Sequence, residues 1–292
     1  MSRGYFTFAQ NSIAYFDEKI YVDYLKHAYG LALSIKATQR EVTDISVAIT
    51  PEMKVPDKYR EVFDHIIEIP WGDMSVNFDN KFYNEWKVGH ITPYDETVKI
   101  EADMLLTSPI DHWWDQMALY DMLFTHKVHN YRNEEITSRY CRGTFDSNNL
   151  PNVYNGFMYF KKDNANTLEF FKMAEMISKD YEKFSNTFLD HTRPKQMDTD
   201  TVYGLATQLI QKENEFLRND LAVPTFVHMK KELMNWELHY ESYAWTQCVK
   251  YFFDGDMNLY VSNYKQTLPF HYHEKNFLTD NMILLYEKVL GI

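Results

Sequence analysis

The stretch that decides the fold is TVKIEADMLLTS, residues 97–108. Apolar residues on both sides would suit a buried strand, but Glu101 and Asp103 interrupt them with only Ala102 between. Burying unpaired carboxylates is costly, so their charge must be met by a partner. The pattern predicts a strand that is broken in its middle at an acidic site.

A divalent cation is the partner that this pair fits. In an extended strand both carboxylates point to the same face, because side chains alternate with period two. Ligands of open α/β sheets bind beyond the carboxyl ends of the strands. Two oxygen donors at such a place suit Mn²⁺ or Mg²⁺, which in turn holds a diphosphate. The alternative is a solvated acidic pair on a sheet edge, and the apolar flanks argue against it.

Strand and helix patterns alternate on the N-terminal side of this stretch. Strands are predicted at 4–10, 44–50 and 64–70, and helices at 21–38, 56–63 and 84–94, the last one ended by Pro93. Residues 71–82 are polar without a clear period and are predicted to form a loop. This alternation predicts an α/β fold with a mostly parallel central sheet flanked by helices.

The C-terminal side is more mixed. It contains strand patterns at 150–162, with a turn signal at Asn155-Gly156, and at 224–231. Helices are predicted at 165–184, at 198–216 with Asp198 as N-cap, and at 279–290. No break in composition marks a boundary, so we expect a single domain over 1–292. Residues 1–110, approximately, would form a nucleotide-binding half and 111–292 an acceptor half.

Composition limits the classes of function. The chain has 292 residues and a formal net charge of −12, which argues against broad, non-specific binding of nucleic acid but not against a local basic groove. No signal sequence and no membrane-spanning run is evident. Cys141 and Cys248 lie far apart and are expected to be reduced core thiols of a cytoplasmic protein.

Histidines near the C-terminus could complete a metal site. LPFHYHEK places His271 and His273 on either side of Tyr272, and FVHMK offers His228 as a rival ligand. A neutral imidazole can complete a carboxylate metal site. The alternative is an ordinary surface or core histidine pair.

Further charged residues are candidates for ligand contacts. Asp198 and Asp200 in MDTDTVYGLA either cap a helix or accept hydrogen bonds from a polyhydroxylated ligand such as a sugar. Cations could stabilise a diphosphate leaving group. Taken singly, each cation could equally form a surface ion pair. The candidate cations are Lys87, Arg132, Arg139, Arg142 and Lys275, with Lys87 and Lys275 leading.

Several common motifs are absent from the sequence. It has no G-x-x-x-x-G-K-S/T loop, no G-x-G-x-x-G, no G-x-S-x-G and no H-E-x-x-H. Their absence argues against the commonest nucleotide kinases, dehydrogenases, serine hydrolases and zinc proteases.

The order of these motifs resembles that of the GT-A-fold glycosyltransferases of the glycogenin-like kind. The resemblance rests on FTFAQNS, NEWKVGHITPYDETVKIEADMLLTS, VYNGFMYFKK, MDTDTVYGLA and a histidine close to the C-terminus. A closer resemblance, through EIPWGD, FVHMK and PFHYHEK as well, is to phage-encoded glycosyltransferases that act on hydroxymethylated pyrimidines in DNA. The acidic triplet departs from the usual D-A-D of that fold, because Glu101 takes its first place.

The resemblance implies roles for individual residues. Phe8, Ala9 and Gln10 would line the base and ribose of a nucleotide sugar. Glu101, Asp103 and His271 or His273 would hold Mn²⁺ or Mg²⁺, and Lys87 and Lys275 would meet the phosphates. Asn155, Gly156 and Asp200 would face the donor sugar or the reacting centre. Asp198 or Asp200 would be the general base if the reaction inverts the anomeric configuration.

The expected function is therefore metal-dependent transfer of a sugar from a nucleotide sugar, such as a UDP-sugar, to a hydroxyl group. The resemblance points to 5-hydroxymethylcytosine in DNA as the acceptor, in the host cytoplasm. Arg139, Arg142 and Arg193 could then form a basic surface for the DNA. The alternatives are a saccharide, lipid or protein acceptor, a nucleotidyltransferase, and a non-catalytic protein that binds sugar nucleotides.

Overall fold

The computed structural model describes residues 1–10, 12–15, 19–73, 81–139, 142–190, 192–194, 196–230 and 244–292. Residues 74–80 of the predicted loop, and Cys141, lie outside these ranges. Within them, no helix combines the length and the apolar character needed to cross a membrane.

The centre of the fold is a six-stranded sheet with strand order β5-β4-β1-β6-β9-β8. The first four strands are mutually parallel, whereas β9 runs antiparallel to both of its neighbours. The strand bounds are β5 His65–Glu68, β4 Ile45–Ile49, β1 Arg3–Ala9, β6 Glu96–Ile100, β9 Tyr154–Lys161 and β8 Met122–Thr125. The predicted α/β fold with a mostly parallel sheet is confirmed.

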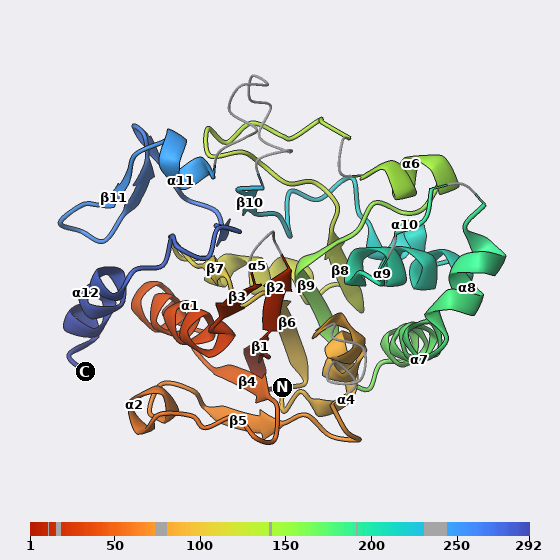
Figure 1. Ribbon diagram of the computed structural model, residues 1–292, viewed down its shortest axis with the longest axis horizontal. Coiled ribbons are helices and arrows are strands. Elements are labelled where there is room, and N and C mark those ends of the chain that lie inside the picture. The colour runs from red at the N-terminus through yellow and green to blue at the C-terminus, as the bar shows by residue number, and fades with distance from the viewer. Residues whose placement is uncertain are drawn as a thin grey trace.

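Alternating side chains of the central strands feed two hydrophobic cores. On β1, Tyr5 and Ala9 pack into the core beneath α1 and α12, whereas Phe6 and Phe8 pack into the core beneath α7 and α9. Strands buried on both faces read as apolar runs, which explains the pattern YFTFA. Figure 1 shows α1 and α12 on one side of the sheet and α7 and α9 on the other.

Capping side chains fix where the longer helices begin. Asp23 accepts a hydrogen bond from the Lys26 N–H at the start of α1, and Asp198 and Thr279 cap α9 and α12 in the same way. The helix bounds are α1 Tyr24–Thr38, α2 Asp57–Arg60, η1 Lys81–Lys87, α4 Val88–Ile91, α5 Asp111–Met117, α6 Gly143–Asn148, α7 Ala165–Lys179, α8 Tyr181–Phe188, α9 Thr199–Leu209, α10 Glu213–Phe216, α11 Trp245–Cys248 and α12 Asp280–Leu290.

A small sheet of order β10-β14-β7 lies beyond the carboxyl end of β6 and includes two strands from the C-terminal part of the chain. Its strands are β10 Val227–His228, β14 Phe270–His271 and β7 Met104–Leu105. A hairpin pairs β2 Ser12–Tyr15 with β3 Lys19–Val22. A third sheet contains β11 Tyr251–Phe253, β12 Leu259–Val261 and β13 Tyr264–Lys265.

Five local predictions were wrong. The helix predicted over 198–216 is two helices, α9 and α10, with residues 210–212 between them. The segment 84–94 forms the end of a 3₁₀ helix and one α-helical turn that ends at Ile91, two residues before Pro93. The helix predicted over 165–184 is two helices divided at Asp180, whose backbone leaves the helical region. Asn155-Gly156 lies inside β9 and makes no turn. Cys248 is a half-buried free thiol and not a core residue.

Candidate metal and ligand site

The acidic residues lie in a turn at the carboxyl end of β6. β6 ends at Ile100, and Glu101, Ala102 and Asp103 form the link to β7, so the predicted break in this strand is confirmed. The turn, and not strand alternation, makes the two carboxylates converge. Asp103 is buried and Glu101 is half-buried. The two carboxylates therefore lie close together beyond the carboxyl end of β6.

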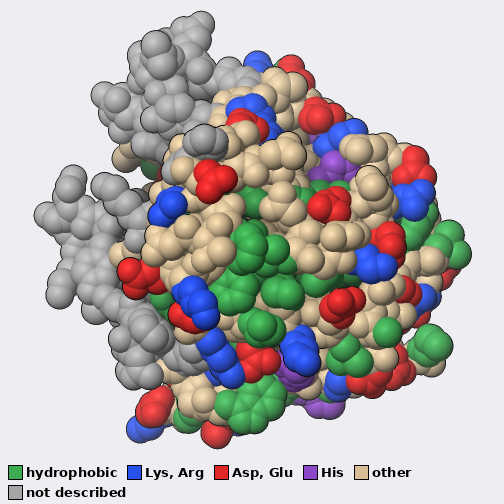
Figure 2. All heavy atoms as spheres, turned by 90° about the vertical axis from the view of Figure 1, so that its right-hand side faces the viewer, with side chains coloured by type: hydrophobic (Ala, Val, Ile, Leu, Met, Phe, Trp, Pro, Cys, Tyr) green, Lys and Arg blue, Asp and Glu red, His purple; other side chains and the backbone are tan. Residues whose placement is uncertain are grey.

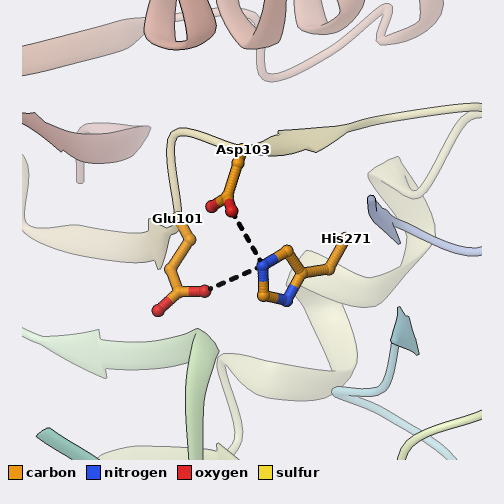
Figure 3. A group of neighbouring side chains, drawn as sticks. All are labelled: Glu101, Asp103 and His271. Carbon is orange, nitrogen blue, oxygen red and sulfur yellow. Dashed lines mark hydrogen bonds and ion pairs between the residues drawn. The ribbon is translucent and has the colours of Figure 1, made fainter. Parts of the chain in front are cut away.

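His271 joins the two carboxylates from the far end of the chain. β14 pairs antiparallel with β7, which places His271 opposite Met104, next to Asp103. Its Nε2 atom lies 3.1 Å from Asp103 Oδ2 and 3.4 Å from Glu101 Oε2. Figure 3 shows both carboxylates directed toward this one ring nitrogen.

This donor set fits one divalent cation. Ligand atoms of the three residues all lie within 4.8 Å of one another. Two ligands at about 2.1 Å from one ion, at a right angle, are roughly 3 Å apart. The nitrogen-to-oxygen distances in this cluster have that size. Two carboxylate oxygens and an imidazole nitrogen suit Mn²⁺ or Mg²⁺.

Two further residues of the C-terminal segment adjoin the cluster. The Lys275 ammonium contacts Asp103 Oδ2. Burial is the largest single effect and lowers the pKa of Lys275, but the charge and hydrogen bond of Asp103, with Tyr24 and Glu101, together outweigh it, so the pKa is raised overall. Burial, together with the nearby His271 and Lys275, lowers the pKa of His273 to about 3. His273 lies at φ +58°, in the left-handed region that non-glycine residues rarely adopt.

His228 lies behind His271. β10 and β14 pair in parallel with His228 opposite His271, and their rings stack with centroids 4.7 Å apart and planes 16° apart. Burial, and the neighbouring His271 and His273, hold the pKa of His228 well below its usual value. Among the described residues, the possible metal-binding cluster includes His271 but neither His228 nor His273.

A pocket of about 470 Å³ opens over the cluster. It brings together side chains from both halves of the chain. The predicted site residues that line it are Glu101, Asp103, Arg142, Asn155, Gly156, Asp198, Asp200, His228, His271, His273 and Lys275. This arrangement can hold a cation on one wall and a polar organic ligand between that wall and the start of α9.

Asn155 connects the two walls of this pocket. Its N–H donates to Asp200 Oδ1 at 2.8 Å, and its side-chain amide lies 3.5 Å from Glu101 Oε1. Within the described part of the chain its buried Oδ1 has no hydrogen-bond partner. An unpaired buried acceptor is costly, so this atom is suited to a hydroxyl donor of a ligand.

Arg142 supports the wall that α9 contributes. Its guanidinium donates to Asp200 Oδ2 at 2.7 Å and to Asn152 Oδ1 at 2.8 Å. The group also lies over the rings of Phe145 and Tyr154, at 3.6 and 4.3 Å from their centroids. Arg142 is therefore buried and occupied by intramolecular contacts.

Asp198 caps α9, and its surroundings shift the pKa of its carboxyl group. Its carboxylate accepts hydrogen bonds from the Thr201 N–H and hydroxyl, both at 2.8 Å. Burial first, and the charge of Asp200 second, raise its pKa. The predicted helix cap is confirmed, and the same carboxylate faces the pocket.

A narrow cavity of about 20 Å³ continues beneath the acidic pair. Phe8 and Gln10 line it, whereas Ala9 is packed in the core on the other face of β1. Its floor holds a buried ion pair in which Lys99 Nζ lies 2.7 Å from Glu85 Oε2. Sequence reasoning missed this pair, because a lysine in β6 gives no sign of the glutamate 14 positions earlier that it meets.

Lys87 and three arginines do not line the pocket. Lys87 is buried, and its Nζ donates to the carbonyls of Pro70 and Gly72 at 2.9 and 2.6 Å. Arg132 pairs with Glu134 and Arg139 with Asp146. Arg193 donates to the Leu189 carbonyl and to Asn186.

Charges of both signs mix on the surface that Figure 2 shows. Among the described side chains on this face, Lys and Arg alternate with Asp and Glu, and no continuous basic patch forms.

Sequence reasoning also missed pocket-lining residues such as Tyr24, Thr199 and Phe226. Their spacing is that of ordinary helix and core residues, so no local signal marks them.

Comparisons in sequence found no relative, since no protein-family model and no curated protein matches the chain. In structure, the chain is similar to the galactosyltransferase LgtC in complex with donor and acceptor sugar analogs, at 12% identity over 82% of this chain and 94% of that one, with a TM-score of 0.45. It is also similar to mouse xyloside xylosyltransferase 1, at 9% identity over 75% of this chain and 84% of that one, with a TM-score of 0.44.

A third similar structure is the apo-form glycosyltransferase GlyE of Streptococcus pneumoniae TIGR4. It matches at 10% identity over 75% of this chain, with a TM-score of 0.41. The chain spans less than half of that protein's length, 45%.

Proposed function

We propose that this protein is a metal-dependent glycosyltransferase that moves a sugar from a nucleotide sugar, such as a UDP-sugar, to a hydroxyl acceptor. The observation that carries the proposal is the cluster of Glu101, Asp103 and His271 at the mouth of the pocket. In open α/β folds, ligands usually bind beyond the carboxyl ends of the strands, which is where this cluster lies. The pocket also has room for an organic ligand beside the cluster.

In this proposal Glu101, Asp103 and His271 hold Mn²⁺ or Mg²⁺. When bound, the ion supplies Lewis-acid stabilisation of the diphosphate that leaves the donor. Lys275 adds a positive charge at the same place, because its ammonium already lies against Asp103. From the sequence resemblance we propose that Phe8 and Gln10 contact the nucleoside, which would lie outside the cavity of about 20 Å³ that they line, because that space fits only about one water molecule. The first 110 residues, approximately, would then form the donor half of a single domain.

The sugar would lie between the acidic pair and α9. Asn155 Oδ1 is the buried acceptor that a sugar hydroxyl would satisfy. Asp200 is held by Asn155 and Arg142, so its carboxylate has a fixed orientation at the edge of the pocket. For an inverting reaction Asp198 is a candidate general base, because its carboxylate lines the pocket and burial raises its pKa, and Asp200 is the other candidate.

For the acceptor we propose, from the sequence resemblance, the hydroxymethyl group of 5-hydroxymethylcytosine in DNA. The competing acceptor is a hydroxyl of a saccharide, lipid or protein. Arg142 is buried and engaged with Asp200 and Asn152, so Arg139 and Arg193 would have to meet the phosphates. DNA binding predicts a steep fall of acceptor affinity with salt, whereas a neutral glycan predicts a shallow one.

A thermal-shift panel tests donor binding. Each nucleotide sugar is added with and without Mn²⁺, and the melting temperature is measured. A ligand that binds only the native state raises that temperature, so the donor should stand out and should need the ion for its full effect. If no nucleotide sugar shifts the melting temperature in either condition, the proposal is wrong.

Product analysis then separates the reaction classes. A glycosyltransferase breaks the bond between the anomeric carbon and the diphosphate and releases a nucleoside diphosphate. A nucleotidyltransferase releases pyrophosphate instead. A protein that binds the donor without releasing either product is a binding protein.

A further inference from the structure

The second ring nitrogen of His271 receives, from the described residues, no hydrogen bond of the kind that usually supports metal-binding histidines. Nε2 faces the acidic pair, but the buried Nδ1 has no hydrogen-bond partner among the described residues. In most metal sites that nitrogen donates to a carboxylate or carbonyl, which fixes the orientation of the ring. Among the described residues, contacts other than a hydrogen bond at Nδ1 must therefore fix the rotation of the His271 imidazole.

Aromatic packing takes that place. The ring of His228 lies nearly parallel to that of His271, at 4.7 Å and 16°. The strand pairing of β10 with β14 sets this contact, because it brings the two residues opposite each other. Phe226 approaches the rings of both histidines, with centroids 5.6 Å from His228 and 5.9 Å from His271.

His228 is itself held firmly. It is buried, and Tyr154 packs edge-on to its ring with centroids 6.1 Å apart. Packing of flat rings at these distances is favourable beyond the area that it buries. A ring confined on several sides restricts the rotation of the ring stacked on it.

We propose that His228 is a positioning residue for the metal site: its ring face keeps His271 in the orientation that binds the cation. The inference rests on the metal site of the proposed function. In this inference His228 does not bind the ion itself. The group of possible ligands among the described residues includes His271 and leaves His228 out. The aromatic face is the functional part of His228, and its nitrogens are dispensable for holding the ion.

Substitutions that separate the face from the nitrogens test this directly. His228→Phe keeps a flat ring and removes both nitrogens. His228→Leu keeps apolar volume without a flat face, and His228→Ala removes both. Mn²⁺ affinity is measured without nucleotide sugar, by calorimetric titration, and the melting temperature of the metal-free protein is recorded for each variant.

We expect His228→Phe to bind Mn²⁺ within about threefold of the wild type. Loss of an outer-shell partner typically costs 10–100-fold in metal affinity, so His228→Leu and His228→Ala should fall in about that range. If His228→Ala does not fold, His228→Leu alone provides the test. Wild-type affinity in the Leu variant, or in Ala, would overturn the inference. So would a Phe variant as weak as Ala, because a nitrogen would then be required.

Asp103→Asn distinguishes this inference from the proposed function. If the wild type binds Mn²⁺, Asp103→Asn does not and His228→Leu binds normally, only the role of His228 is wrong. If the wild type binds neither Mn²⁺ nor Mg²⁺, the metal site of the proposed function fails and the inference fails with it.

Discussion

The Nε2 atom of His271 lies 3.1 Å from Oδ2 of Asp103, although the two residues are 168 positions apart in the chain. The backbone supports the contact, because the Tyr272 N–H donates to the Asp103 carbonyl at 3.2 Å. Pairing of β14 with β7 therefore completes the site from the C-terminal end of the chain.

Asp103→Asn should abolish turnover while the fold persists. The amide keeps the shape of the side chain but removes the charge that meets a cation and Lys275. Loss of a group that stabilises developing charge typically lowers kcat by about 100-fold or more. Turnover and the rise of melting temperature with Mn²⁺ are the measurements. Asp115→Asn, at an exposed carboxylate, is the matched control. Unchanged turnover in Asp103→Asn would remove the acidic pair from the mechanism.

Lys99→Met should destabilise the protein strongly, whereas Lys99→Met with Glu85→Leu should not. The two charges are buried together, with side chains 1% and 9% exposed. Removal of one leaves the other uncompensated, which costs about 3–5 kcal/mol, whereas replacing both by apolar groups is often neutral or stabilising. Urea unfolding measures both effects. A double variant as unstable as the single one would contradict this account.

Lys87 should contribute a gain in stability as the pH rises from 8 to 10. Burial, against a smaller opposing effect of Asp73, lowers its pKa from 10.5 to about 8. Across that window Lys87 holds its proton in the unfolded chain but not in the folded chain, so its contribution to the free energy of unfolding increases with pH. The rise should be about 2 kcal/mol, given 1.36 kcal/mol for each pH unit of pKa difference.

Lys87→Met is the comparison for that pH dependence. The wild type and the variant share all other titrating groups, so the difference between their unfolding free energies isolates Lys87. That difference should change by about 2 kcal/mol from pH 8 to pH 10. A difference that stays constant over this range would show that Lys87 keeps its ordinary pKa in the folded protein.

Arg142→Lys should lower turnover by at least about tenfold without weakening Mn²⁺ binding. Lysine cannot reproduce the fork of hydrogen bonds to Asp200 and Asn152 or the stacking on Phe145. Asp200 would lose its fixed orientation, but the acidic pair would be unaffected. Arg218→Lys, at an exposed ion pair, is the control. Equal turnover in both variants would argue against a role for this wall of the pocket.

Most helices and strands of the fold could be predicted from local patterns in the sequence. The apolar run of β1, the cap at Asp198 and the break between β6 and β7 depend on residues close together in the chain. Neighbouring residues set helix periodicity, caps and strand alternation, so these features can be predicted from sequence. The exceptions were the 3₁₀ segment of η1, the helix divided at Asp180, the break between α9 and α10, and Asn155-Gly156, where the local pattern did not give the observed backbone.

The tertiary structure alone decided which charged side chains form the site. Sequence placed Lys87 and Arg142 among the ligand contacts, yet Lys87 meets backbone carbonyls and Arg142 holds Asp200. It also left three histidines as rivals, and only the pairing of β10, β14 and β7 places His271 at the acidic pair with His228 stacked on it. The physical reason is that a charge or ring takes its partner from whatever long-range strand pairing brings near, and no local spacing records that choice.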